Sequence, residues 1–237
     1  MERCPTFRLR DMISSLFDLH VLWRRQPTQR VFFKQIYFTG LQALPLVLLV
    51  GGAVAGIIIA ELRQFGQSPK DSIDILLDIT LSELAPLLTA FLVTARSAPA
   101  MASELATMQA NGEIRLLMRL GVPPIDYLIV PRVAGMAVAG LLLAIYFSFA
   151  ATLAGGAFAA KSHMFDALTL AAESAGITLF VQCLMKSLLF GAAIGSVSCF
   201  TGLAARGSFT EVPIAASRAV VRSLVAVLVL DLLLVML

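Results

Sequence analysis

Three charged residues stand inside stretches of sequence that are otherwise apolar. Glu83 lies in "SELAP", Lys186 in "CLMKSLLFG" and Asp231 in "LVLDLLLVML". A charge near the centre of a bilayer costs about 3 kcal/mol on insertion scales, so such groups normally face a cavity or an opposite charge. We therefore expect the three side chains to form one paired, inward-facing set. That set either takes part in substrate passage or only holds the helices together.

Pro86 follows Glu83 by three residues. Because proline has no backbone N–H, it loosens a helix and leaves a carbonyl oxygen one turn earlier without its usual donor. We expect such a freed carbonyl beside Glu83.

The sequence lacks the short motifs of several enzyme classes. It has no G-x-x-x-x-G-K-[ST] phosphate loop, no H-E-x-x-H, no G-x-S-x-G and no Cys/His ligand cluster. The chain itself is therefore not expected to hydrolyse ATP, to bind a metal or to be an enzyme.

The elements that must position the charges are membrane-spanning helices. Only 14% of the 237 residues are charged and the mean hydropathy is +0.88, whereas about a quarter of a soluble domain is charged. Apolar runs long enough to cross a bilayer predict an all-α, polytopic protein with five spans. The expected spans cover residues 38–60, 75–96, 131–160, 174–200 and 216–237. Gly52 and Gly56, and Gly191 and Gly195, have GxxxG spacing, which we interpret as helix packing.

The distribution of Lys and Arg predicts the orientation. Segments 1–34, 96–132 and 201–222 hold fourteen of these residues, whereas 61–74 and the connection around residue 161 hold three. By the positive-inside tendency, the N-terminus is cytoplasmic and the C-terminus lies outside. Residues 1–34 are basic and amphipathic around Trp23, with no cleavable signal sequence. We expect an interfacial helix there; the alternative is an ordinary cytoplasmic extension.

A polar stretch, "ELATMQANGEIRLLMRLGVPP", separates the second and third spans. Ile114, Leu117 and Met118 fall on one side at helical spacing, and Arg115 and Arg119 on another. We expect a cytoplasmic helix over 104–120 that the prolines of "VPP" stop. From the residues alone it is either a connector lying on the membrane or a docking element for a soluble partner.

The region from Ser82 to Arg132 resembles the signature of MlaE/YrbE permeases, the membrane subunits of ABC transporters linked to MCE proteins. The family pattern runs approximately E-L-G-P, G-R-x-G-(S/A)-A, A-E-L-G-T-M, E-x-I-D-A-L and G-x-D-P-x-x-Y-L-x-x-P-R, and it continues more weakly over residues 31–237. The matching positions are Glu83, Leu84, Pro86, Arg96, Ala100, Glu104, Leu105, Thr107, Met108, Glu113, Ile114, Leu117, Gly121, Pro124, Tyr127, Leu128, Pro131 and Arg132.

The resemblance implies a five-span subunit of the bacterial inner membrane with an N-terminal interfacial helix. It implies a second permease protomer, a P-loop ATPase subunit that binds ATP and Mg²⁺ in place of any cofactor in this chain, an MCE-domain protein and a phospholipid or other hydrophobic cargo, with no nucleic acid. By carry-over, the intramembrane polar positions are Glu83, Lys186, Asp231 and Arg218. The positions implied to couple to the ATPase are Glu104, Met108, Glu113, Arg115, Leu117 and Arg119.

The sequence also departs from the family pattern. Ala85 and Ala106 replace glycines, Pro99 replaces a small residue, and Arg115 and Pro123 stand where the family has Asp. The last two changes alter the charge of the docking face, which suggests a divergent ATPase. Homodimer and heterodimer both remain open. Two other readings compete with an ABC permease: an ion- or proton-coupled secondary transporter that uses Glu83, Lys186 and Asp231, and a membrane scaffold.

Overall fold

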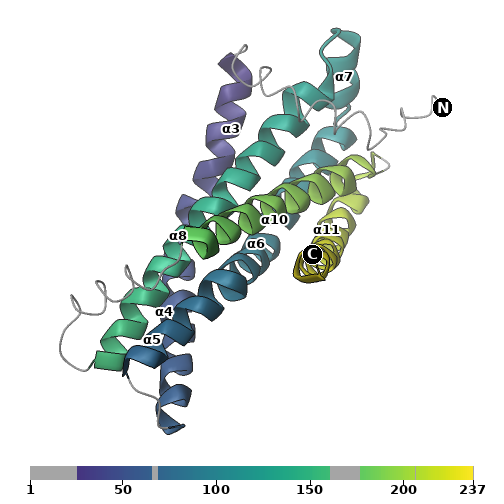
Figure 1. Ribbon diagram of the computed structural model, residues 1–237. Coiled ribbons are helices and arrows are strands. Elements are labelled where there is room, and N and C mark those ends of the chain that lie inside the picture. The colour runs from purple at the N-terminus through teal and green to yellow at the C-terminus, as the bar shows by residue number, and fades with distance from the viewer. Residues whose placement is uncertain (1–25, 66–68, 161–176, 206, 237) are drawn as a thin grey trace.

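The computed structural model describes residues 26–65, 69–160, 177–205 and 207–236, and these residues form helices and no strand (Figure 1). Five helical segments are long and apolar enough to cross a membrane. The predicted all-α, five-span architecture is therefore confirmed. Most of the predicted interfacial segment lies in residues 1–25, outside the described part of the chain.

The first span is preceded by a separate helix. α3 (Gln26–Thr39) is joined by a 3₁₀ turn, η1 (Leu41–Ala43), to α4 (Leu44–Gln64). Residues 26–34, expected in the interfacial segment, thus begin a helix that runs on to Thr39. α3 packs against the third span and leaves Phe33 and Tyr37 exposed.

The second span is longer than predicted. It consists of α5 (Pro69–Ile79), a π-helical turn η2 (Thr80–Leu84) and α6 (Ala85–Ala110). Pro86 lies in the first turn of α6, but η2 runs directly into α6, so the missing N–H falls inside a continuous helical segment. Beyond residue 96 the helix continues for almost four turns without a break.

The predicted single helix over 104–120 is wrong. Residues up to Ala110 belong to α6, the chain turns at Asn111 and Gly112, and only α7 (Glu113–Arg119) is a separate helix. Gly112 and Gly121 bracket α7 with φ of 76° and 74°, a region that glycine enters without a side-chain clash.

The C-terminal stop of α7 is also a glycine rather than the expected prolines. Gly121 donates its N–H to Met118 O at 3.1 Å, and Val122 donates to Leu117 O at 3.0 Å. This pair of bonds is the Schellman arrangement, and it ends the helix before Pro123 is reached.

The remaining spans are η3 (Ile125–Ile129) with α8 (Val130–Ala160), α10 (Ile177–Leu203), and η4 (Phe209–Glu211) with α11 (Val212–Met236). α8 lies in the middle of the bundle and contacts α3, α4, α5, α6 and α10. In its most apolar stretch 72% of residues are buried, against 17% in α11. α8 is therefore the central helix and α11 a peripheral one that packs on α6 and α10.

The two GxxxG pairs both lie at helix contacts, but with different partners. A Cβ on Gly191 would stand 2.7 Å from the Met136 carbonyl oxygen, and one on Gly195 would stand 3.1 Å from Val133 Cα, both in α8. A Cβ on Gly52 or Gly56 would meet only the side chains of Ala154 and Phe158. Gly191 and Gly195 thus permit close backbone contact between α8 and α10.

Candidate functional site

Lys186 of α10 is the centre of a charged cluster within the spans. Its Nζ lies 2.7 Å from Glu83 Oε1 in η2 and 4.0 Å from Asp231 Oδ1 in α11. The three residues expected to pair therefore do lie together, drawn from three different spans. The ammonium is hydrogen-bonded to Glu83, whereas Asp231 is an electrostatic neighbour at the limit of an ion pair.

A backbone carbonyl supplies the second hydrogen bond of the ammonium. Lys186 Nζ donates to Ser82 O at 3.1 Å. Ser82 is four residues before Pro86, so its carbonyl is the one that the missing proline N–H would otherwise bind. The prediction of a freed carbonyl beside Glu83 is confirmed, and the π-helical turn at residues 80–84 contains it.

Exposure distinguishes the three charged side chains. The side chain of Lys186 is 14% exposed and that of Asp231 18%, whereas Glu83 is 41% exposed. Asp231 Oδ1 is buried and has no hydrogen-bond partner among the described residues. Two carboxylates thus share one ammonium, and the cluster opens to its surroundings on the Glu83 side. Such an arrangement can exchange partners when a polar group approaches.

Arg218 does not belong to this cluster. It lies exposed near the start of α11, thirteen residues before Asp231, which is about 20 Å along a helix. There it lines a small depression together with Glu211 and Arg222. Residues this far apart on one straight helix cannot reach the same point, so Arg218 stays a predicted substrate-cavity position that lies apart from Lys186, Glu83 and Asp231.

The residues expected to couple to an ATPase are divided between two helices. Glu113, Arg115 and Arg119 are exposed on α7, and Leu117 is partly buried. Leu116 and Leu120 are also exposed, so the outer face of α7 is both basic and apolar.

Glu104 and Met108 lie apart from that face, on α6. Met108 packs against the hydrophobic core, and Glu104 pairs with Arg132 of α8 with an Oε1–Nη2 distance of 3.0 Å. Glu104 therefore holds the second and third spans together.

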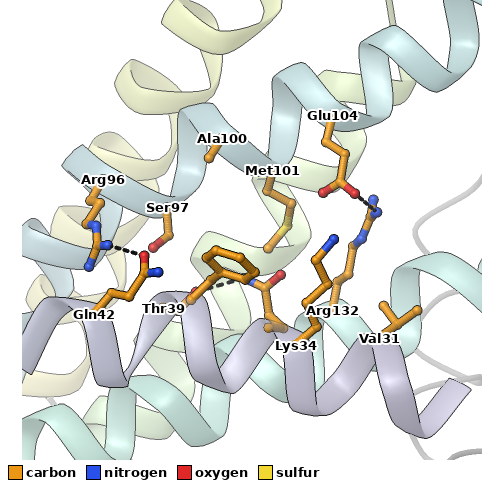
Figure 2. Close-up of a pocket in the computed structure, with 12 residues that line it drawn as sticks. Val31, Lys34, Thr39, Gln42, Arg96, Ser97, Ala100, Met101, Glu104 and Arg132 are labelled. Carbon is orange, nitrogen blue, oxygen red and sulfur yellow. Dashed lines mark hydrogen bonds and ion pairs between the residues drawn. The ribbon is translucent and has the colours of Figure 1, made fainter.

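A pocket of about 350 Å³ lies between α3, α6 and α8 (Figure 2). The Glu104–Arg132 pair stands at one end of it, and Arg96 donates to Gln42 Oε1 at 2.6 Å at the other. Lys34 of α3 lines it between them. This pocket was not predicted from the sequence. Its only indication in the sequence was an arginine at the end of each of two apolar spans, Arg96 and Arg132.

Comparison with known proteins gives a consistent result. A family model described as "Permease MlaE" matches residues 32–237. A probable ABC transporter permease protein of Synechocystis is 32% identical over 222 residues, covering 89% of this chain and 82% of that protein. The chloroplastic protein TRIGALACTOSYLDIACYLGLYCEROL 1 of Arabidopsis thaliana is 32% identical, covering 84% of this chain and 58% of that protein.

A probable ABC transporter permease protein of Rickettsia typhi is more distant, at 26% identity over 84% of this chain. The family match begins within α3 and includes all five spans and α7. Because it covers this whole arrangement rather than one motif, the chain is a multi-pass ABC transporter permease that belongs to the MlaE permease family.

Proposed function

We propose that this chain is the membrane subunit of a transporter that moves phospholipid or another hydrophobic molecule between the inner membrane and the cell envelope. ATP hydrolysis in a separate P-loop ATPase subunit would drive the movement. The name of the Arabidopsis relative, which is that of a galactolipid, and the ABC permease names of the other relatives support this assignment.

One structural observation carries the proposal. The π-helical turn with Glu83 and the exposed helix α7 are joined by the single helix α6. A partner that binds α7 is thereby connected by continuous backbone to the charged cluster within the spans. This is the connection that a transport subunit driven from outside the membrane requires.

The ATPase would bind the outer face of α7. Arg115 and Arg119 supply charge for recognition, and Leu116 and Leu120 supply exposed apolar surface, which is the composition of a protein interface. In the orientation that the Lys and Arg distribution predicts, α7 and the N-terminus are cytoplasmic and the C-terminus is periplasmic.

A second permease protomer and an MCE-domain protein are further partners that the family resemblance implies. The peripheral helix α11 has exposed Val225, Leu228 and Leu232 on its surface. In a membrane this face contacts either lipid or another protomer.

The assembly is tested by purifying the tagged full-length chain from its native membrane in mild detergent, followed by mass spectrometry. We expect a P-loop ATPase and an MCE-domain protein to co-purify. Repeated recovery of the chain without an ATPase, together with uptake into liposomes driven by an ion gradient, would instead establish the secondary-transporter alternative.

The docking face is tested by the double variant Arg115→Gln/Arg119→Gln. We expect a several-fold lower yield of ATPase complex because interface charges and their hydrogen bonds are lost. The matched control is Arg218→Gln/Arg222→Gln, which removes two arginines with the same spacing from the exposed start of α11. Equal yields for both double variants would show that α7 is not the docking element.

A further inference from the structure

The pocket between α3, α6 and α8 has an excess of positive charge. Lys34, Arg96 and Arg132 line it, against the single carboxylate of Glu104 (Figure 2). Glu104 is already paired with Arg132. Lys34 Nζ lies 5.8 Å from the centre of the Phe38 ring, and the described residues offer it no carboxylate within ion-pair distance.

Two guanidinium nitrogens in this pocket are left without acceptors. Nη1 of Arg96 and Nη1 of Arg132 are both buried and have no hydrogen-bond partner among the described residues. The Arg132 side chain is only 6% exposed. An unpaired donor on a buried charged group is costly. Both nitrogens are shielded from solvent, so an acceptor that enters the pocket contributes first by neutralising the charge of the guanidinium groups that line it.

The position of the pocket indicates the chemistry of that acceptor. Arg96 ends the uncharged stretch that follows Glu83, and Arg132 precedes the uncharged stretch of α8. Both therefore lie toward the α7 end of their spans, where we place the level of the lipid headgroups. Guanidinium groups match phosphate oxygens in geometry, and basic pockets between spans at this level suit anionic lipid headgroups. We propose that this pocket binds a phosphate-bearing anion.

A neighbouring surface favours a lipid as the source of the phosphate. A second pocket of about 560 Å³ lies between α3 and α8, and its lining is apolar apart from Lys34 and two tyrosines. Tyr37, Leu41 and Tyr146 are exposed there. Because Lys34 borders both pockets, an anion held at its ammonium can place acyl chains along an apolar surface. This binding site is separate from the Lys186 cluster and requires neither ATPase nor transport.

The test is native mass spectrometry of the full-length protein in mild detergent, titrated with phosphatidylglycerol or phosphatidylcholine. We expect the anionic lipid to bind more tightly. The variant Lys34→Gln/Arg96→Gln should lose about tenfold or more in affinity for phosphatidylglycerol, since each change removes a charged donor. It leaves the Glu104–Arg132 pair intact and so should fold.

The matched control is Arg115→Gln/Arg119→Gln, which removes the same charge from exposed positions on α7 and should stay within about twofold of the wild type. Inorganic phosphate, added as a competitor, distinguishes the two sources. Competition at millimolar concentration would show that the pocket accepts the free anion, and its absence would show that the lipid is required. Equal affinity for the two lipids, or equal losses in both double variants, would overturn the proposal.

Discussion

Lys186 determines how the two intramembrane carboxylates can be accommodated. It is the cation closest to Glu83 and Asp231, at 2.7 and 4.0 Å, and it also binds the Ser82 carbonyl. Removing it leaves two acceptors, Glu83 and the Ser82 carbonyl, without their donor and Asp231 without its neighbouring cation, in a region where unpaired charge is expensive. The stability of the cluster therefore depends more on Lys186 than on either acid alone.

We predict that Lys186→Met lowers the free energy of unfolding by about 1–3 kcal/mol, less than a fully buried pair would lose because Glu83 is partly exposed. Glu83→Gln should cost less, since its amide oxygen still accepts a hydrogen bond from the ammonium. Thermal unfolding of the two variants in detergent measures the difference. A Lys186→Met melting temperature equal to that of the wild type would mean that the lysine stabilises neither carboxylate.

A triple variant separates a functional role of the cluster from a purely structural one. Replacing a buried ion pair by apolar residues of similar volume is often neutral for stability, so Lys186→Met/Glu83→Met/Asp231→Leu should remain folded. If the charges take part in transport, this variant should lose lipid-stimulated ATPase activity in the reconstituted complex. Wild-type activity would show that the charges only pin the spans together.

The sequence was sufficient to predict that these three charges meet, because the cost of isolated charges in a bilayer leaves few other arrangements. It was also sufficient for the freed carbonyl, since Pro86 acts through local covalent structure. It did not separate Arg218 from these three, because that residue was carried over from a family pattern without a distance along the helix. Lys34 and Gln42 were missed because their role depends on how α3 packs against two other helices.

At the scale of elements, the contact between α8 and α10 depends on backbone proximity. We predict that Gly191→Ala lowers thermal stability, because the added methyl would stand 2.7 Å from Met136 O and 2.8 Å from Ala137 Cα, and backbone cannot rotate away as a side chain can.

Gly52→Ala is the matched control, with only the Ala154 methyl within reach at 3.6 Å. It should be neutral or slightly stabilising, since alanine is the better helix former. Equal melting temperatures for the two alanine variants would contradict this account of the interface.

The length of α6 was not predictable from hydropathy. Ser103, Glu104 and Thr107 make its second half polar, which suggested a separate helix. In the structure Ser103 donates to Ala100 O and Thr107 to Ser103 O, so the hydroxyl groups are satisfied within the same helix. The chain reverses only at Gly112, where a positive φ is available without strain.

At the scale of the whole molecule, α7 and the C-terminal end of α4 lie at opposite ends of the bundle (Figure 1). The excess of Lys and Arg predicts that the α7 end is cytoplasmic. The number of spans followed from the apolar runs of the sequence, whereas the central place of α8 did not, because helix order in a bundle depends on contacts between distant segments.

Labelling with a membrane-impermeant maleimide tests this orientation in intact spheroplasts. In a variant that lacks the native cysteines, Phe65→Cys should be labelled from outside and Leu116→Cys only after the membrane is broken. Both side chains are well exposed, at 79% and 57%, so access to the reagent is set by the side of the membrane. The reverse pattern would invert the proposed topology.

α6 continues through Pro99 without ending there, and its length has a mechanical consequence. Twenty-six residues make a rod about 39 Å long, with the Glu83 turn at one end and α7 at the other. A tilt of about 10° around its midpoint would swing each end by about 3 Å for a rod of that length. That travel is comparable to the distances from Lys186 Nζ to its two carboxylates. A displacement of this size that moved Glu83 away from Lys186 would lengthen their contact beyond ion-pair distance and leave Asp231 as the nearer carboxylate.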